Sequence, residues 1–264
     1  MDNQRGVLVT GAAGRIGAAI VRAFAELGDR IVATDLDADK LAASARAPGE
    51  RGGVVTAIPA DITDEPAVER LVAAAVDALG RVDVLVNCAG IFPNTPVIEM
   101  ATAEWDWVYG VNLRGPFLLS RAVARHMLAH GIRGAIVNIS SGASSSARTG
   151  GAHYCGSKAA LEMFTKVLAI ELGPRQIRVN AVAPGLILDQ VLQPPVPPGT
   201  SPYVAALLDG IPLRRTGRPE DIAAAVAFLC SDQAAWTTGT VLEVNGGSQA
   251  GRTHLPPSSS QSAR

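Results

Sequence analysis

The sequence predicts an α/β protein in which one doubly wound parallel sheet of about seven strands is covered by helices on both faces. Short runs rich in β-branched residues alternate with longer segments whose apolar residues recur at helical spacing, which is the pattern of repeated βαβ units. The strand-like runs are continuously apolar, as in parallel strands buried on both faces. At 264 residues, 48% of them hydrophobic, the chain can form one large core. We therefore expect a single domain over residues 1–250.

The elements are expected to alternate along the chain. The predicted strands are residues 7–10, 31–34, 54–58, 82–87, 135–140, 177–182 and 240–244. The predicted helices are residues 16–28, 64–79, 103–130, 152–172 and 219–231. The proline-rich segment 186–213 is too long for an ordinary connection, so we interpret it as a lid or substrate loop. The polar, Pro/Ser-rich tail 251–264 is expected to be disordered.

Composition excludes several classes of partner. The chain has 23 basic and 24 acidic residues, and neither sign forms a long run, so we expect no nucleic-acid or membrane partner. The three cysteines lack any CxxC or Cys/His spacing, so we expect no disulfide framework and no metal site. The sequence shows no signal-peptide pattern and no long apolar span, which predicts a cytoplasmic protein.

A glycine-rich turn follows the first predicted strand and opens the first predicted helix. Gly11, Gly14 and Gly17 lie in this turn, where glycine permits positive φ and lets the backbone approach a ligand. A pyrophosphate there would accept hydrogen bonds from free N–H groups at the helix N-terminus. The pattern indicates a Rossmann-like dinucleotide site; the alternative is a tight turn with no ligand.

The choice of dinucleotide depends on two residues of opposite charge. Asp35 follows the second predicted strand, where an acid can bind the ribose hydroxyls and would repel the extra phosphate of NADP. Arg15 lies in the glycine turn and could instead pair with that phosphate, or could be a solvated side chain. We favour NAD as the cofactor and keep NADP as possible.

A tyrosine and a lysine form the candidate catalytic pair. Tyr154 and Lys158 are four residues apart on a predicted helix and therefore share a face, where a nearby ammonium would stabilise the phenolate. The same spacing is common by chance in a surface Tyr beside a solvated Lys. Ser141 favours the catalytic interpretation, because it ends a predicted strand where ligands bind in such sheets, and its hydroxyl could contact a substrate oxygen.

Over about residues 7–247 the chain resembles the short-chain dehydrogenase/reductase family, of the classical type. The motifs that carry the resemblance are TGAAGRIG at 10–17, NCAG at 87–90, Asn112 in VNLRGPF, ISS at 139–141, YCGSK at 154–158, PG at 184–185 and the closing stretch 218–247. The resemblance implies a catalytic set of Asn112, Ser141, Tyr154 and Lys158. Tyr154 would be the general acid/base, Ser141 would polarise the carbonyl, and Lys158 would hold the nicotinamide ribose and lower the pKa of the tyrosine. Asn112 would position a water that links Lys158 to solvent.

The resemblance also implies a set of cofactor contacts. These are Gly11, Arg15, Ile16, Gly17, Asp35, Asp61, Ile62, Asn87, Ala89, Gly90, Tyr154, Lys158, Pro184, Gly185 and Ile187. Asp61 and Ile62 would meet the adenine, Asn87, Ala89 and Gly90 would line the adenine-ribose side, and Ile187 would touch the carboxamide. Asp61 could instead cap the following helix.

Three residues depart from the family pattern. Arg15 replaces the middle glycine of the usual TGxxxGxG, and Cys88 replaces an asparagine of NNAG. Asp189 stands where a threonine is frequent after the PG pair, and a pyrophosphate would repel its carboxylate. We therefore expect Asp189 to point away from the cofactor or the following loop to run differently.

Three functions are compatible with these residues. The favoured one is an NAD-dependent dehydrogenase of a secondary alcohol, diol or sugar-like substrate. The alternatives are an NADPH-dependent ketone or 3-oxoacyl-thioester reductase, and a non-catalytic cofactor-binding scaffold or sensor. No basic cluster marks an anionic substrate; Arg148 and His153 could contact one, or could be solvated loop side chains.

Assembly is also expected from the resemblance. Similar proteins form homotetramers through the equivalents of helices 103–130 and 157–173 and through the C-terminal strand, so a homotetramer or homodimer is expected. The apolar residues that would contribute here are Trp105, Trp107, Phe117, Met163 and Phe164. The alternative is that they belong to the core of a monomer.

Overall fold

The computed structural model of the protein describes residues 4–45 and 53–251. Within these residues the chain forms a parallel sheet in the order β3-β2-β1-β4-β5-β6-β7. The strands are β1 (Gly6–Thr10), β2 (Arg30–Thr34), β3 (Val54–Ala57), β4 (Val84–Asn87), β5 (Ala135–Ile139), β6 (Arg178–Pro184) and β7 (Val241–Val244). The predicted seven-stranded doubly wound sheet is confirmed. Except for its first residue, the predicted disordered tail lies outside the described residues.

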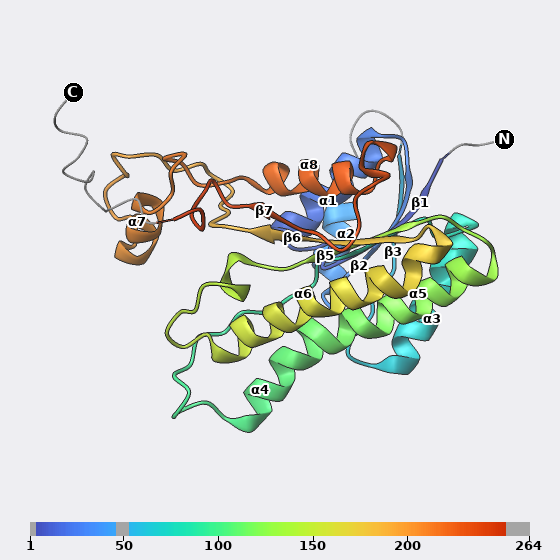
Figure 1. The fold of residues 1–264 in the computed structure, drawn as a ribbon, viewed down its shortest axis with the longest axis horizontal. Helices are drawn as coiled ribbons and strands as arrows, with labels where there is room; N and C mark the ends of the chain where they lie inside the picture. Colours follow the sequence, from blue (N-terminus) through green and yellow to red (C-terminus); the bar gives the residue numbers. More distant parts are fainter. Residues whose placement is uncertain (1–3, 46–52, 252–264) are drawn as a thin grey trace.

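Helices cover both faces of the sheet, as Figure 1 shows. The helices are α1 (Arg15–Glu26), α2 (Ala38–Ala45), α3 (Glu65–Leu79), α4 (Thr102–Tyr109), α5 (Gly115–Ala129), α6 (Ala152–Leu172), α7 (Pro202–Asp209) and α8 (Pro219–Leu229). Helices α1 and α8 lie on one face, and α3, α5 and α6 lie on the other. Each face has its own apolar cluster, centred on residues such as Phe24 and Val226 on the α1/α8 side and Leu71 and Leu119 on the α3/α5 side. None of the described helices is long and apolar enough to cross a membrane.

The structure differs from the predicted elements in three places. Helix α2 was not predicted, because its single buried residue, Leu41, gives little apolar periodicity. The predicted helix 103–130 is interrupted by a π-helical turn at Gly110–Arg114. The predicted loop 186–213 contains α7, which begins at Pro202 where proline is tolerated in a first helical turn.

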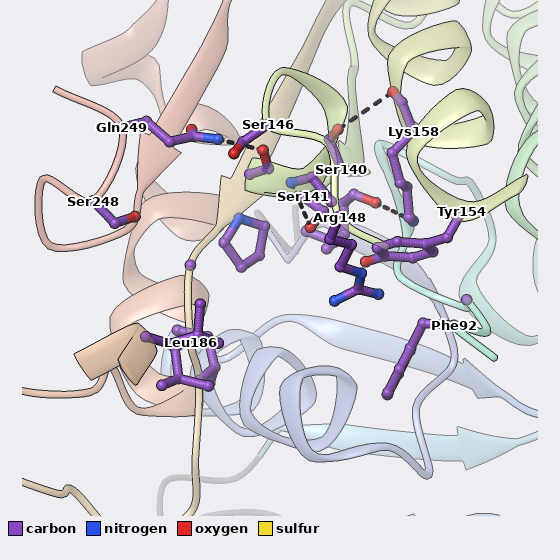
Figure 2. A pocket seen from close by; sticks show the side chains of 18 of the residues that line it. Phe92, Ser140, Ser141, Ser146, Arg148, Tyr154, Lys158, Leu186, Ser248 and Gln249 are labelled. Carbon is purple, nitrogen blue, oxygen red and sulfur yellow. Dashed lines mark hydrogen bonds between the residues drawn. The ribbon is translucent and has the colours of Figure 1, made fainter. Parts of the chain in front are cut away.

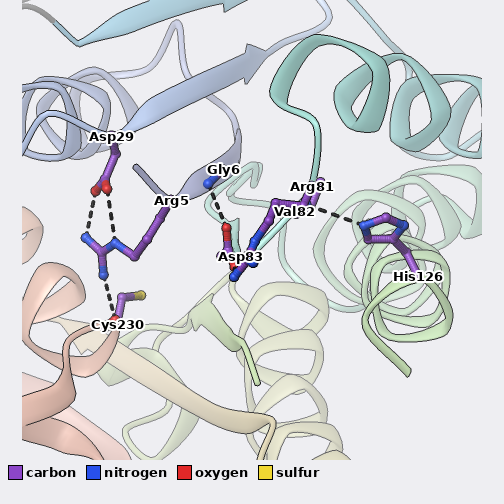
Figure 3. A network of polar contacts seen from close by, with 8 residues as sticks. All are labelled: Arg5, Gly6, Asp29, Arg81, Val82, Asp83, His126 and Cys230. Carbon is purple, nitrogen blue, oxygen red and sulfur yellow. Dashed lines mark hydrogen bonds and ion pairs between the residues drawn. The ribbon is translucent and has the colours of Figure 1, made fainter. Parts of the chain in front are cut away.

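A network of charged residues joins segments at the amino ends of the strands (Figure 3). The guanidinium of Arg5 donates to both carboxylate oxygens of Asp29, at 3.0 and 2.6 Å, and to the carbonyl of Cys230 at 2.8 Å. Asp83 is also buried; it accepts from the amide of Gly6 at 2.9 Å and pairs with Arg81. These bonds satisfy the buried carboxylates and hold β1, β2 and β4 together at the edge away from the carboxyl ends of the strands.

Candidate active site

A cavity of about 1020 Å³ opens at the carboxyl ends of β5 and β6. It is lined by the end of β5, the first turns of α6, the segment after β6, and α7. The catalytic candidates Ser141, Tyr154 and Lys158 all face it (Figure 2). Ligands bind at this edge in open α/β sheets, and the order of the strands reverses here between β1 and β4.

The two serines that follow β5 lie in different environments. The Ser140 hydroxyl is buried and donates to Glu162 Oε1 at 2.7 Å. The Ser141 hydroxyl accepts from the amide of Ala143 at 3.1 Å, lines the cavity and contacts the Tyr154 hydroxyl. The geometry therefore favours Ser141 as the group that meets a substrate oxygen.

Lys158 is buried beneath the cavity floor. Its ammonium Nζ donates to the carbonyl of Ile139 at 2.7 Å and lies 5.9 Å from the centre of the Tyr154 ring. Burial lowers the pKa of Lys158 to about 8. The charge of this lysine is therefore sensitive to pH near 8.

The pKa of Tyr154 is shifted in the direction opposite to the one expected. Burial raises the pKa of its hydroxyl above the ordinary value, while the Ser141 hydroxyl and the positive charge of Arg148 lower it in part. The prediction that Lys158 lowers this pKa is wrong in this structure, because the ammonium faces the Ile139 carbonyl beside the ring. Arg148 is the cation that acts on the phenol here.

Asn112 lies in the π-helical turn, fully buried. Its Oδ1 accepts from the amide of Ile91 at 2.9 Å, and its Nδ2 donates to the carbonyl of Ile91 at 2.9 Å and to Ser157 Oγ at 3.2 Å. Single π-helical turns are frequent at functional sites, since the extra residue redirects a side chain. Asn112 thereby ties the segment after β4 to α6, one residue before Lys158.

The glycine turn fits a bound pyrophosphate. Gly11 has φ +64°, and a Cβ there would lie 2.7 Å from the amide nitrogen of Ala89, so only glycine fits. A Cβ on Gly17 would lie 2.1 Å from the carbonyl oxygen of Gly11. No side chain caps the N-terminus of α1, whose residues Arg15 and Ile16 line the cavity, so free N–H groups of the first turn are available to an anion.

Two acids flank this turn in different ways. Asp35 Oδ2 accepts from the amide of Ala13 at 3.0 Å, which holds the carboxylate beside the glycine turn at the end of β2. Asp189 pairs with the Arg15 guanidinium at 3.6 Å, and both side chains are largely exposed. The loop after β6 therefore places Asp189 beside Arg15, and these two departures from the family pattern form an ion pair.

Several predicted cofactor contacts do not line the cavity. The Asn87 side chain is turned inward, where its Nδ2 donates to Asn138 Oδ1 and Ser120 Oγ at 2.8 and 3.1 Å. The Ile62 side chain packs in the core against Gly115. Ala89 lies behind the glycine turn, with its amide donating to Thr10 Oγ1 at 3.1 Å.

Asp61 does not cap the following helix. Its Oδ1 accepts from the amide of Thr63 at 2.8 Å, whereas Asp64 caps α3 by accepting from the amide of Ala67 at 3.1 Å. The capping alternative for Asp61 is therefore wrong. Of the remaining predicted contacts, Gly90, Pro184, Gly185 and Ile187 line the cavity.

Some cavity residues were not found from the sequence. Phe92, Asn94, Ser248 and Gln249 line the cavity although no motif marks them. His153 behaves differently from both sequence interpretations: it is fully buried, its Nε2 bonds to Glu104 Oε1 at 2.9 Å, and its Nδ1 accepts from the amide of Tyr154 at 2.9 Å. His153 thus anchors the start of α6 and does not reach the cavity.

The fold and the site define an oxidoreductase that uses a nicotinamide dinucleotide. Residues 11–249 match the family model described as enoyl-(acyl carrier protein) reductase. The chain is 40% identical over 240 residues to a D-threitol dehydrogenase of Mycolicibacterium smegmatis, covering 91% of each chain. It is also 40% identical over 247 residues to the L-xylulose reductase of Homo sapiens, covering 92% of this chain and 96% of the relative.

A solved structure supports the same assignment. A short-chain type dehydrogenase/reductase from Mycobacterium marinum superposes with a TM-score of 0.85 at 31% identity, covering 94% of this chain and 96% of that one. The chain belongs to the short-chain dehydrogenase/reductase family.

Proposed function

We propose that the protein is an NAD-dependent dehydrogenase of a secondary alcohol with further hydroxyl groups, such as a diol or sugar alcohol. The observation that carries the proposal is the convergence of Ser141, Tyr154 and Lys158 on one cavity that also contains the uncapped N-terminus of α1. The relatives named as D-threitol dehydrogenase and L-xylulose reductase support a polyhydroxylated substrate.

In the proposed mechanism the Tyr154 phenolate takes the hydroxyl proton of the alcohol while a hydride leaves the same carbon. The bound nicotinamide ring would supply the hydride acceptor in this direction and the donor in the reverse one. Ser141 donates to the substrate oxygen and orients it toward Tyr154. Lys158, whose ammonium is buried beside the Tyr154 ring and donates to the Ile139 carbonyl, holds the cofactor ribose. Asn112 keeps α6 in register with the segment after β4.

Two contacts support NAD over NADP. The Asp35 carboxylate is fixed beside the glycine turn, where it would repel a second phosphate. The Arg15 guanidinium, the group that could bind that phosphate, pairs with Asp189 instead. We therefore propose NAD as the physiological cofactor.

A ketone reductase is the second candidate, since the same residues run the reaction in reverse. The family model and the relative named L-xylulose reductase favour it. A non-catalytic scaffold is disfavoured, because binding alone does not require Ser141 and Tyr154 to meet in the cavity.

Two measurements test the proposal. NADH should bind at least about tenfold more tightly than NADPH, a difference of about 1.4 kcal/mol, and Asp35→Asn should reduce this preference. Tyr154→Phe should lower kcat by about 10²–10⁴-fold, with the dissociation constant of NADH within about threefold of wild type. Tighter binding of NADPH would contradict the cofactor assignment, and turnover retained by Tyr154→Phe would contradict the proton transfer.

We also propose a homotetramer built on α4, α5 and α6. Large apolar side chains on these helices are exposed: Trp105, Trp107, Phe117, Met163, Val167 and Ile170. The alternative that Trp105, Trp107, Phe117 and Met163 form a monomer core is therefore wrong, and only Phe164 packs against the core.

A further inference from the structure

One cation in the cavity has no partner within the described part of the chain. The Arg148 guanidinium lies over the ring of Tyr154, with Cζ 4.8 Å from the ring centre (Figure 2). No described carboxylate lies within 4.0 Å of it, and its buried Nε has no hydrogen-bond partner among the described residues. A buried N–H without an acceptor is costly, so the Nε position is unfavourable until something accepts its hydrogen bond.

The chain holds Arg148 in this position through its backbone. Asn94 Nδ2 donates to the carbonyl of Thr149 at 2.9 Å, and the amide of Thr95 donates to the carbonyl of Gly150 at 3.0 Å. Gly150 has φ +73°, and a Cβ there would lie 2.3 Å from Asn94 Oδ1. A Cβ on Gly151 would lie 2.9 Å from Arg148 Cγ. Two glycines and two hydrogen bonds to backbone carbonyls therefore fix the loop that presents the guanidinium.

All charged residues that line the cavity in the described part of the chain are basic. Arg15, Arg148 and Lys158 line it, and none of its described lining residues is acidic. Arg15 pairs with Asp189, and Lys158 donates to the Ile139 carbonyl. Arg148 is thus the cation of the described lining that neither an acid nor a backbone acceptor satisfies.

We propose that Arg148 binds a carboxylate of the substrate, so that the alcohol oxidised at Tyr154 belongs to a hydroxy acid. The carboxylate lies close to the reacting carbon, because the guanidinium stacks on the ring of the acid/base residue itself. A planar guanidinium matches a carboxylate through two parallel hydrogen bonds. The Ser146 and Thr149 hydroxyls also line the cavity and suit further hydroxyls, which points to a polyhydroxylated acid. This inference rests on the dehydrogenase proposed above.

The test compares aldonates with alditols of the same chain length and configuration, each assayed with NAD. The wild-type protein should oxidise its best aldonate with a kcat/KM at least about tenfold above that of the matching alditol. Arg148→Gln should lower kcat/KM for aldonates about 10- to 100-fold more than for the matching alditols, with the additional loss mainly in KM. Arg175→Gln, which removes an exposed charge away from the cavity, is the matched control and should leave both unchanged.

Arg148 could instead act only through Tyr154, since its charge lowers the pKa of that hydroxyl. In that case Arg148→Gln would reduce kcat equally for aldonates and alditols and shift the pH profile of oxidation upward, which overturns the proposal. Binding of aldonates to the protein–NADH complex, followed by NADH fluorescence, gives a readout that needs no turnover. Equal aldonate affinity in wild type and Arg148→Gln overturns the proposal as well. If the protein binds aldonates through Arg148 but oxidises none of the alcohols, the binding proposal stands and the proposed dehydrogenase function is contradicted.

Discussion

At the scale of single residues, Lys158 connects protein stability to pH. Burial lowers its pKa in the folded protein to about 8, whereas an unfolded chain gives it the ordinary value near 10.5. The folded state therefore disfavours protonated Lys158. This cost is complete below about pH 8 and disappears above about pH 10.5, and each unit of the difference corresponds to about 1.4 kcal/mol.

The consequence can be measured against Lys158→Met, which removes the titrating group. The free energy of unfolding of the wild type, relative to that of the variant, should rise by about 3 kcal/mol between about pH 8 and pH 10.5. Urea unfolding of both proteins across this range tests it. A difference that stays constant with pH would show that Lys158 is not buried as a charged group.

At the scale of elements, the π-helical turn at Gly110–Arg114 determines what Asn112 can contact. A regular α-helix from residue 103 to 130 would contain no extra residue, and the Asn112 side chain would point elsewhere. In the observed turn, Asn112 satisfies both backbone groups of Ile91, which no strand or helix pairs. In the segment after β4, the Asn112 side chain thus supplies the hydrogen bonds that a strand or helix would otherwise give to the backbone of Ile91.

We expect Asn112→Ala to lower the free energy of unfolding by about 1–3 kcal/mol, because the amide and the carbonyl of Ile91 lose their partners. Hydrogen exchange at the Ile91 amide should accelerate at the same time. Ser157→Ala is the matched control, since it removes one bond of Asn112 but leaves Ile91 paired. An Ile91 amide that stays protected in Asn112→Ala would contradict this role.

At the scale of the whole molecule, the face formed by α4, α5 and α6 sets the expected assembly. Phe117 on α5 lies 6.1 Å, centre to centre, from Phe164 on α6, so the exposed apolar side chains of the two helices continue one surface. Met163 is 60% and Ile170 77% exposed. A monomer would leave this surface in water at a cost of about 25 cal/mol per Å².

If the proposed tetramer forms through this face, Ile170→Glu should shift it to smaller species, measured by light scattering. Leu27→Glu places the same charge at an exposed apolar position beyond the end of α1, on the other side of the sheet, and should leave the assembly unchanged. A wild type that is monomeric at micromolar concentration would refute the assembly.

The sheet and most of its helices could be predicted because burial produces local sequence patterns. A strand buried on both faces is a continuous apolar run, and a helix buried on one face has apolar residues at 3.6-residue spacing. Helix α2 could not, because only Leu41 faces the core. Helix α7 could not be predicted either, because the prolines of segment 186–213 suggested a loop and only Leu208 of the helix is buried. Gly11 and Tyr154 were found through spacing, whereas Phe92 and Gln249 belong to no motif.

The sequence by itself determined the order of the elements, the glycine turn and the residue types of the catalytic set, since each depends on neighbours within a few positions. Only the tertiary structure decided which of these side chains share an environment. It turned Asn87 inward, paired Arg15 with Asp189, and placed Arg148 over Tyr154. It also raised the pKa of Tyr154 where spacing had suggested a lowered one. Burial and partner geometry come from segments distant in sequence, so no local pattern encodes them.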